Sequence, residues 1–196
     1  NSMFDLQNLD LVPLEDKQKH KKNIDYCKKH NVKKYIETGA YRGKTVEAIF
    51  MAKKLGNINV VDIFAIELSE QHANKLLKTY NSRYIDVHIH KGDTVKELPK
   101  VLQKITEPAL FWLDAHHSGG DTAKGSTDCP VLKELAIIAK HKIKDHIILI
   151  DDARAFHFKH SPDWPSLKRI CNAIKKINKN YDIFIENDII IAQLEN

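Results

Sequence analysis

An acidic residue followed by a glycine-containing turn stands at the end of a short apolar segment within residues 35–45. The order is Glu37-Thr38-Gly39, and Gly43 closes the turn before a helix-like stretch begins. Glycine adopts backbone conformations that bring main-chain N–H groups close to a ligand, and parallel sheets bind small ligands at the carboxyl ends of their strands. The segment therefore predicts a strand–turn–helix site that combines backbone N–H groups with a carboxylate.

Acidic groups recur at the ends of the other apolar segments. Glu67 ends the second, Asp93 follows the third, and Asp114 ends the fourth. The fifth is followed by the pair Asp151-Asp152. Because the carboxyl ends of parallel strands meet at one edge of a sheet, we expect these carboxylates to surround one crevice of nucleoside size.

The elements that must position these groups alternate along the chain. The hydrophobic pattern predicts strands at residues 32–38, 59–67, 84–90, 109–115, 146–150, 181–186 and 189–194. It predicts helices at 14–30, 45–55, 69–80, 94–105, in a stretch capped by Asp128, and at 164–179. Residues 116–127 and 153–163 are predicted as long polar loops. The turn Asn187-Asp188 between the last two strands indicates an antiparallel hairpin. We therefore expect an α/β fold: a mixed seven-stranded sheet with helices on both faces, in a single domain over residues 3–196.

Composition limits the classes of partner. The chain has 196 residues and a net charge of +5, but its lysines are spread over helix faces, as is typical of solvated surfaces. Nucleic-acid binding would require aromatic residues interleaved with the positive charge, so we do not expect it. No apolar run approaches the roughly 20 residues of a bilayer crossing, and we expect no membrane partner. The first two residues, Asn1-Ser2, read as a cloning remnant.

Cysteine usage favours a reducing compartment. Cys27, Cys129 and Cys171 are odd in number, widely spaced and without a Cys-x-x-Cys motif, which is typical of reduced thiols. No secretory signal is visible at the N-terminus. We therefore expect a cytoplasmic protein.

These features together resemble the class I methyltransferase fold, whose members use S-adenosylmethionine (SAM). The segment Glu37-Thr38-Gly39-Ala40-Tyr41-Arg42-Gly43 is similar to the first motif of the macrocin-type sugar O-methyltransferases, Glu-Thr-Gly-Val-Trp-Arg-Gly. The resemblance implies a Rossmann-like methyltransferase fold with a seven-stranded mixed sheet and a C-terminal antiparallel hairpin. The sequence departs from the family at His116, where the family usually has an Asp that acts as general base.

The resemblance implies a set of residues that bind SAM: Glu37, Gly39, Tyr41, Gly43, Thr45, Glu67, Asp93, Thr94 and Asp114. Glu67 would accept hydrogen bonds from the ribose hydroxyls and Asp93 from the adenine amino group. The alternative for Asp93 and Thr94 is that they only cap the following helix. A nicotinamide dinucleotide is the competing cofactor. Its Gly-x-Gly-x-x-Gly motif is incomplete here, and an acid beside a pyrophosphate would be repulsive, whereas the sulfonium and ammonium of SAM attract acids.

The resemblance also implies a divalent metal, held by Asp114, Asp151 and Asp152. Three carboxylates in one site repel each other unless a cation or shared protons neutralise them. Oxygen ligands favour Mg²⁺ or Ca²⁺, and a bound metal would hold two vicinal hydroxyls and lower the pKa of one of them. The alternative is a metal-independent enzyme that relies on His116 alone.

The predicted catalytic residues are His116 and Asp114, with His116 as the general base. His116 and His117 could instead bind the metal, which would favour Zn²⁺, Mn²⁺ or Fe²⁺. We predict that His117, Arg154 and His157 bind the substrate, with a solvated loop as the plain alternative.

The sequence thus predicts a SAM-dependent O-methyltransferase, magnesium-dependent or dependent on another divalent cation. Its acceptor would be a sugar or other polyol hydroxyl on a small molecule, a nucleotide-sugar or a glycan. A homodimer is an open alternative to a monomer. Two other functions compete: a methyltransferase for a small phenol or for RNA, and a non-catalytic SAM-binding module.

Overall fold

The structure, a computed structural model, describes residues 9–116, 129–159 and 162–195. Its strands are β1 (Lys34–Thr38), β2 (Asp62–Glu67), β3 (Val87–Lys91), β4 (Leu110–Leu113), β5 (Ile147–Ile150), β6 (Asp182–Glu186) and β7 (Ile189–Gln193). Its helices are α1 (Asp16–Lys29), α2 (Lys44–Lys54), α3 (Glu70–Thr79), α4 (Thr94–Leu102), α5 (Val131–Ala139), α6 (Ala153–His157) and α7 (Leu167–Ile177).

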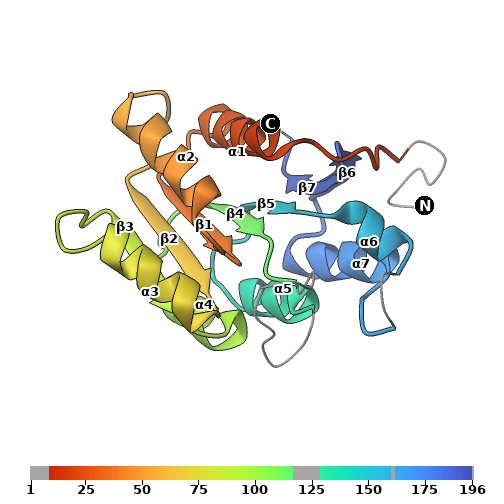
Figure 1. Ribbon diagram of the computed structural model, residues 1–196. Helices are drawn as coiled ribbons and strands as arrows, with labels where there is room; N and C mark the ends of the chain where they lie inside the picture. The colour runs from red at the N-terminus through yellow and green to blue at the C-terminus, as the bar shows by residue number, and fades with distance from the viewer. Residues whose placement is uncertain (1–8, 117–128, 160–161, 196) are drawn as a thin grey trace.

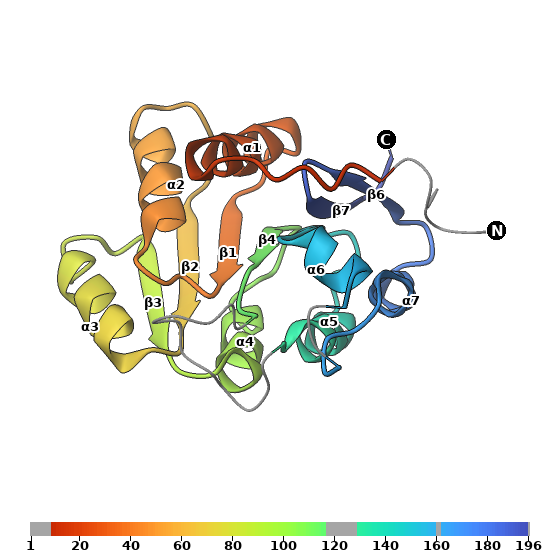
Figure 2. The ribbon, with the colours of Figure 1, turned by 45° about the vertical axis from the view of Figure 1, so that its right-hand side comes forward.

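All seven strands form one mixed sheet in the order β3-β2-β1-β4-β5-β7-β6. The first five strands are parallel, and β7 pairs antiparallel with both β5 and β6. Figure 2 shows β1, β2 and β3 running in the same direction. The predicted α/β fold, with its mixed seven-stranded sheet and C-terminal hairpin, is confirmed.

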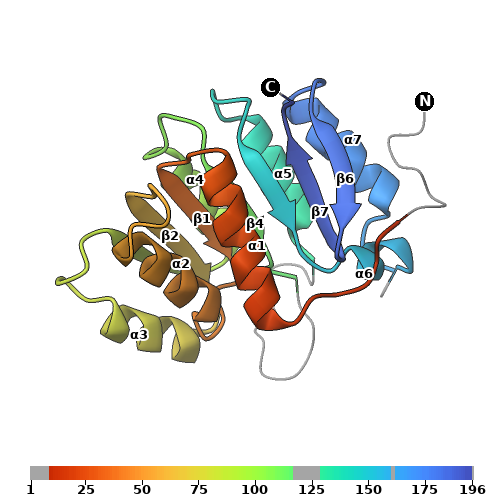
Figure 3. The ribbon, with the colours of Figure 1, turned by 90° about the horizontal axis from the view of Figure 1, so that it is seen from above.

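Helices cover both faces of the sheet and enclose two apolar cores. Figure 1 shows α1 and α2 apart from α5 and α7, and the view from above in Figure 3 shows the sheet between these two pairs. One core lies under α1, α2 and α3, and the other lies under α4, α5, α6 and α7. On α7, Leu167, Ile170, Ile174 and Ile177 are all buried, at the helical spacing read from the sequence. The two layers hold the sheet rigidly, so that its carboxyl edge can carry a site.

Strand register brings three strand ends together at that edge. Thr38 of β1 pairs with Leu113 of β4, and Leu113 pairs in turn with Ile150 of β5. The residues that follow these strands therefore start side by side at the centre of the sheet. This is the edge at which the sequence predicts its acidic crevice.

The terminal hairpin turns through two residues with left-handed backbone. Asn187 has a φ of 51° and Asp188 a φ of 65°. Two consecutive residues with positive φ give the tight turn whose twist matches paired antiparallel strands, and Asn and Asp are among the residues that tolerate it best. The hairpin predicted from Asn187-Asp188 is confirmed.

Several element boundaries differ by a few residues from the sequence-based expectation, and two of the differences have a clear structural cause. Strand β3 begins at Val87 rather than at residue 84, because the Val87 N–H bonds to the carbonyl of Tyr84 in a turn and Ile85 is 82% exposed. The predicted loop 153–163 contains the short helix α6. Its residues Ala153 and Phe156 are buried one turn apart, a signal too short for periodicity to show.

Within the described ranges, no helix has the length and apolar character that a bilayer crossing requires. The three cysteines are buried free thiols.

Candidate active site

The turn after β1 passes directly against the end of β4. Gly39 has a φ of +76°, and a Cβ placed on it would lie 2.3 Å from the carbonyl oxygen of Asp114. Its N–H donates to the carbonyl of Ile66 in β2. Gly43 precedes α2 with a φ of +78°, and a Cβ there would meet the side chain of Leu76 at 2.3 Å. The predicted glycine turn therefore lies where the ends of β1, β2 and β4 come close together.

Glu37 lies under this turn and is almost completely buried. Its side chain is 2% exposed, and its Oε1 accepts a hydrogen bond from the Tyr35 hydroxyl at 2.7 Å. The pKa of Glu37 is raised to about 8, chiefly by burial; the hydrogen bond from the Tyr35 hydroxyl offsets part of this rise, and the negative charge of Glu67 adds to it. A cationic ligand at the turn would favour the charged form of this carboxyl.

Glu67 ends β2 and links the loop after β1 to the loop after β2 through hydrogen bonds. Its Oε1 accepts from the main-chain N–H of Tyr41 and its Oε2 from that of Ser69, each at 2.7 Å. Tyr41 has a φ of +54°, and its ring packs 4.7 Å from the ring of His72. Each carboxylate oxygen retains a second lone pair, so Glu67 can still accept from a ligand hydroxyl.

The remaining predicted SAM residues lie at the starts of helices. Asp93 caps α4, and its Oδ1 accepts from the N–H of Val95 at 2.9 Å. Thr94 is 5% exposed, and Thr45 is partly buried in the first turn of α2. The capping role considered for Asp93 is thus present.

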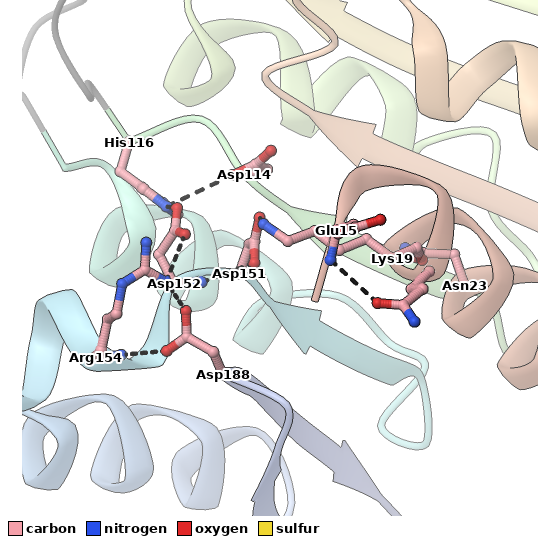
Figure 4. A network of polar contacts seen from close by, with 10 residues as sticks. Glu15, Lys19, Asn23, Asp114, His116, Asp151, Asp152, Arg154 and Asp188 are labelled. Carbon is pink, nitrogen blue, oxygen red and sulfur yellow. Dashed lines mark hydrogen bonds and ion pairs between the residues drawn. The ribbon is translucent and has the colours of Figure 1, made fainter. Parts of the chain in front are cut away.

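Three side chains gather beyond β4 and β5 with geometry suited to a metal ion (Figure 4). His116 Nε2 lies 2.8 Å from Asp152 Oδ2 and 3.6 Å from Asp114 Oδ1. One ligand atom from each of the three residues lies within 4.8 Å of the other two. An imidazole nitrogen and two carboxylates form a mixed N/O donor set.

Aromatic rings fix the orientation of His116. Its ring centroid lies 5.6 Å from that of Phe156 and 5.2 Å from that of Trp164, both in edge-on arrangements. Only 2% of the His116 side chain is exposed. The ring is therefore held with Nε2 toward the two aspartates.

Asp151 lies beside this cluster but has different partners. Its Oδ2 accepts from the ammonium of Lys19 at 3.0 Å, and its Oδ1 accepts from the N–H of Asp152 at 2.9 Å. The predicted metal trio of Asp114, Asp151 and Asp152 is thus divided. Asp114 and Asp152 face His116, and Asp151 faces Lys19 (Figure 4).

The aspartates affect one another's protonation. Burial raises the pKa of Asp114 well above its ordinary value, and the charges of Asp151 and Asp152 raise it further. Burial likewise raises the pKa of Asp151, against the opposing effect of Lys19. Burial would also raise the pKa of Asp152, but its hydrogen bond with His116 and the charge of that ring lower it. The site is over-supplied with negative charge, which a cation would relieve.

Of the predicted substrate residues, Arg154 is engaged within the protein. Its guanidinium forms an ion pair with Asp188 of the hairpin turn and lies 3.6 Å from Asp152 Oδ1. His157 is exposed at the end of α6, with its ring against that of Phe158. His117 lies outside the described residues.

Three residues of the site were not singled out from the sequence: Lys19, Asp188 and Glu134. Glu134 of α5 is 1% exposed, and burial raises its pKa to about 7, an effect that the Thr38 hydroxyl offsets only in part. Asp188, in the turn between β6 and β7, is fully buried. No pattern along the chain marks these residues, because each reaches the site from a different element.

The comparisons with known proteins identify the fold. No protein-family model matches the sequence, and no curated protein does. Solved methyltransferase structures do match. SAH-bound PaMTH1 from Podospora anserina has a TM-score of 0.60 at 14% identity, covering 93% of this chain and 80% of that one. An O-methyltransferase from Bacillus cereus in complex with SAH has a TM-score of 0.60 at 14% identity, covering 96% and 86%.

A third structure, described as CmcI-D160 with Mg and SAM, has a TM-score of 0.60 at 11% identity, covering 93% of this chain and 72% of that one. At such identities the likeness concerns the fold alone. The chain thus has the Rossmann-like fold of class I SAM-dependent methyltransferases, as its sequence predicts. The finer resemblance to macrocin-type sugar enzymes is not confirmed by these structures.

Proposed function

We propose that this protein is a SAM-dependent O-methyltransferase that uses a divalent cation and acts on a hydroxyl of a sugar or another polyol. One observation carries the proposal: the turn at Gly39 touches the backbone of Asp114. A methyl donor bound at this turn would therefore lie beside the cluster of Asp114, His116 and Asp152. Methyl transfer requires such proximity of donor and acceptor.

The residues around the turn suit SAM in charge and shape. Glu37 and Glu67 supply two carboxyls for a ligand that carries a sulfonium and an ammonium. Gly39 leaves room where any side chain would collide with Asp114. We assign the methionine part of SAM to the Gly39 turn, the ribose to Glu67, and the adenine to Asp93 and Thr94.

The donor set beyond β4 suits a divalent metal. Four aspartates lie in or beside the cluster: Asp114, Asp151, Asp152 and Asp188. Two fixed cations, Lys19 and Arg154, face them. With all four carboxylates ionised, two negative charges would be in excess, which is the charge that a divalent cation would balance. Asp114, His116 and Asp152 are the residues that would hold it, and the metal would supply a Lewis acid for the acceptor hydroxyl.

His116 has two competing roles that use the same atom. Nε2 faces both carboxylates, so a metal bound there would displace a proton from between them. With a metal present, we assign His116 as a ligand. Without one, the imidazole is the proton acceptor for the hydroxyl, and Asp152 orients it.

The charge balance also supports an uncharged acceptor. Once a divalent cation offsets the excess of two, the cluster would carry no net charge, so a neutral hydroxyl could approach it without an opposing or unpaired charge. A sugar or polyol, as a small molecule or within a glycan, fits this requirement and offers vicinal hydroxyls to a metal. A homodimer stays an untested prediction for this protein.

Calorimetric titration with SAM tests the first step. We expect saturable binding that is lost in Gly39→Ala, because the added methyl would occupy the turn. A protein that shows neither heat of binding nor a rise in melting temperature with SAM would contradict the proposal.

Chelation separates the two roles of His116. We expect methyl transfer to a polyol to stop after exhaustive chelation and to return on adding Mg²⁺ or Mn²⁺. Full activity in chelator, combined with a large loss in His116→Ala, would instead establish the metal-independent mechanism. A protein that binds SAM but modifies no hydroxyl under any condition would be a binding module.

A further inference from the structure

We propose that Lys19 and Asp151 form an internal ion pair that withholds Asp151 from the metal, so that only Asp114, His116 and Asp152 bind it. This inference rests on the proposed function, because it concerns the metal assigned there. Two adjacent aspartates after β5 would otherwise both be available as ligands. The pair would make Lys19 a positioning residue of the site, contributed by the first helix of the domain.

Both oxygens of Asp151 accept hydrogen bonds, and one of the two donors is a cation, unlike the two main-chain N–H groups that bond to Glu67. Oδ2 accepts from Lys19 Nζ at 3.0 Å, and Oδ1 accepts from the N–H of Asp152 at 2.9 Å. Asp151 as a whole is 3% exposed. The other two aspartates differ, because 34% of the Asp114 side chain and 23% of the Asp152 side chain are exposed. A cation arriving from solvent would therefore meet these two and His116 first.

The position of Lys19 is fixed by the packing of α1. Its side chain is 17% exposed and points from α1 toward the end of β5 (Figure 4). One turn further on, the buried Asn23 donates to the Lys19 carbonyl at 3.0 Å. Lys22 of the same helix bonds to Asn187 Oδ1 and pairs with Glu186. The helix is thus held against the hairpin, and this packing places the Lys19 ammonium beside the Asp151 carboxylate.

An ammonium at this place has two effects on a metal. It neutralises the charge of Asp151, so that this carboxylate no longer attracts the metal ion. It also repels the ion itself, since two cations then lie in one site. We therefore expect a weakly held metal whose remaining coordination positions are open to water and to the acceptor hydroxyls.

Direct titration with Mn²⁺, followed by electron paramagnetic resonance and calorimetry, tests this without any acceptor. The variants are Lys19→Met, Asp151→Asn and the double variant Lys19→Met/Asp151→Asn. Lys21→Met is the matched control, because Lys21 lies on the same helix and is exposed. It removes the same charge from the chain without touching the site. Unfolding curves in chelator verify that each variant is folded.

We expect Lys19→Met to tighten Mn²⁺ binding about tenfold, because a repelling charge is lost and Asp151 becomes available. Asp151→Asn should weaken binding, because the ammonium is left unpaired. The double variant should bind within about threefold of the wild type, since the pair is removed as a neutral unit. Lys21→Met should not differ from the wild type.

The double variant is decisive, and it leaves no unpaired buried charge that could prevent folding. If it loses Mn²⁺ binding as completely as Asp114→Asn does, Asp151 is itself a ligand and the inference is overturned. Unchanged or weaker binding in a folded Lys19→Met would also overturn it. A wild type that binds no Mn²⁺ at all would instead remove the metal from the proposed function, and this inference with it.

Discussion

Gly39 and Gly56 have the same left-handed backbone but different surroundings. Their φ angles are +76° and +75°. A Cβ on Gly39 would lie 2.3 Å from the Asp114 carbonyl oxygen, whereas a Cβ on Gly56 would meet nothing within 4 Å. Gly56→Ala should therefore cost about 1 kcal/mol of stability, from backbone conformation alone. Gly39→Ala should cost at least about 3 kcal/mol, because the backbone of β4 must also move.

Chemical denaturation of the two variants measures this difference, and titration with SAM gives the second readout. Gly56→Ala should bind SAM like the wild type. Gly39→Ala should lose binding even where it is folded. Equal stability and equal SAM binding in both variants would show that the contact between the β1 turn and Asp114 is not required.

Single residues of the site differ in how far the sequence could predict them. Glu37, Glu67 and Asp114 were predicted because each lies at the end of an apolar strand or directly after it, and parallel strands end at one edge. Lys19 could not be predicted in the same way. It is 132 positions from Asp151 and lies on a lysine-rich helix most of whose charged side chains are exposed. Its role depends on how α1 packs across the sheet, which a local pattern does not contain.

At the scale of elements, the hairpin turn supports the short helix α6. Asp188 is fully buried and accepts from the main-chain N–H of Arg154 at 2.7 Å as well as from its guanidinium. Its carbonyl accepts from the N–H of Ala153. The turn itself is held by Asp10, which accepts from the N–H groups of both turn residues. These contacts hold α6 in place, and Asp152 directly precedes this helix.

Arg154→Met should therefore destabilise the protein rather than only weaken substrate binding. The change leaves the buried charge of Asp188 without its cation, which typically costs about 3 kcal/mol. The double variant Arg154→Met/Asp188→Asn should recover part of this loss. Thermal and denaturant unfolding measure both, and the exposed Arg169→Met on α7 is the control. A normal stability combined with a raised KM for the acceptor would restore Arg154 to the substrate-binding role predicted from the sequence.

Elements with a strong hydrophobic pattern were predicted, whereas α6 was not. Strand β4 is a continuous buried run and helix α7 has buried positions at helical spacing, so both patterns were visible in the sequence. Helix α6 has five residues, of which only Ala153 and Phe156 are buried. Its position depends on contacts with the hairpin turn, so tertiary structure defines it. Phe156 and His116 nevertheless meet through this helix, which makes it part of the site.

At the scale of the whole molecule, topology explains why acids distant in sequence share one edge. The order β3-β2-β1-β4-β5 places β1 and β4 at the centre, where their ends are adjacent. Alternation of strands and helices was sufficient to predict this sheet, because right-handed crossovers leave few arrangements. The acceptor was not predictable from the same pattern, since the fold is shared by enzymes of many substrates.

The fold as a whole should lose stability between pH 4.5 and pH 7 through the buried Glu134. Burial raises its pKa from 4.5 to about 7 in the folded state. In this window the unfolded chain releases the proton and the folded protein retains it, so rising pH favours unfolding. At about 1.4 kcal/mol per pH unit, the loss approaches about 3 kcal/mol above pH 7.

Glu134→Gln removes this titration while keeping the side chain neutral and similar in shape. In the part of the chain that the structure describes, Glu134 Oε2 and Thr94 Oγ1 are buried without hydrogen-bond partners, so a Gln amide could donate to the threonine hydroxyl. The variant should match the wild type below pH 4.5 and become more stable than it by about 3 kcal/mol at pH 8. Urea unfolding at several pH values, in chelator, measures the difference. A stability difference that does not change between pH 4.5 and 8 would show that Glu134 ionises alike in the folded and unfolded states.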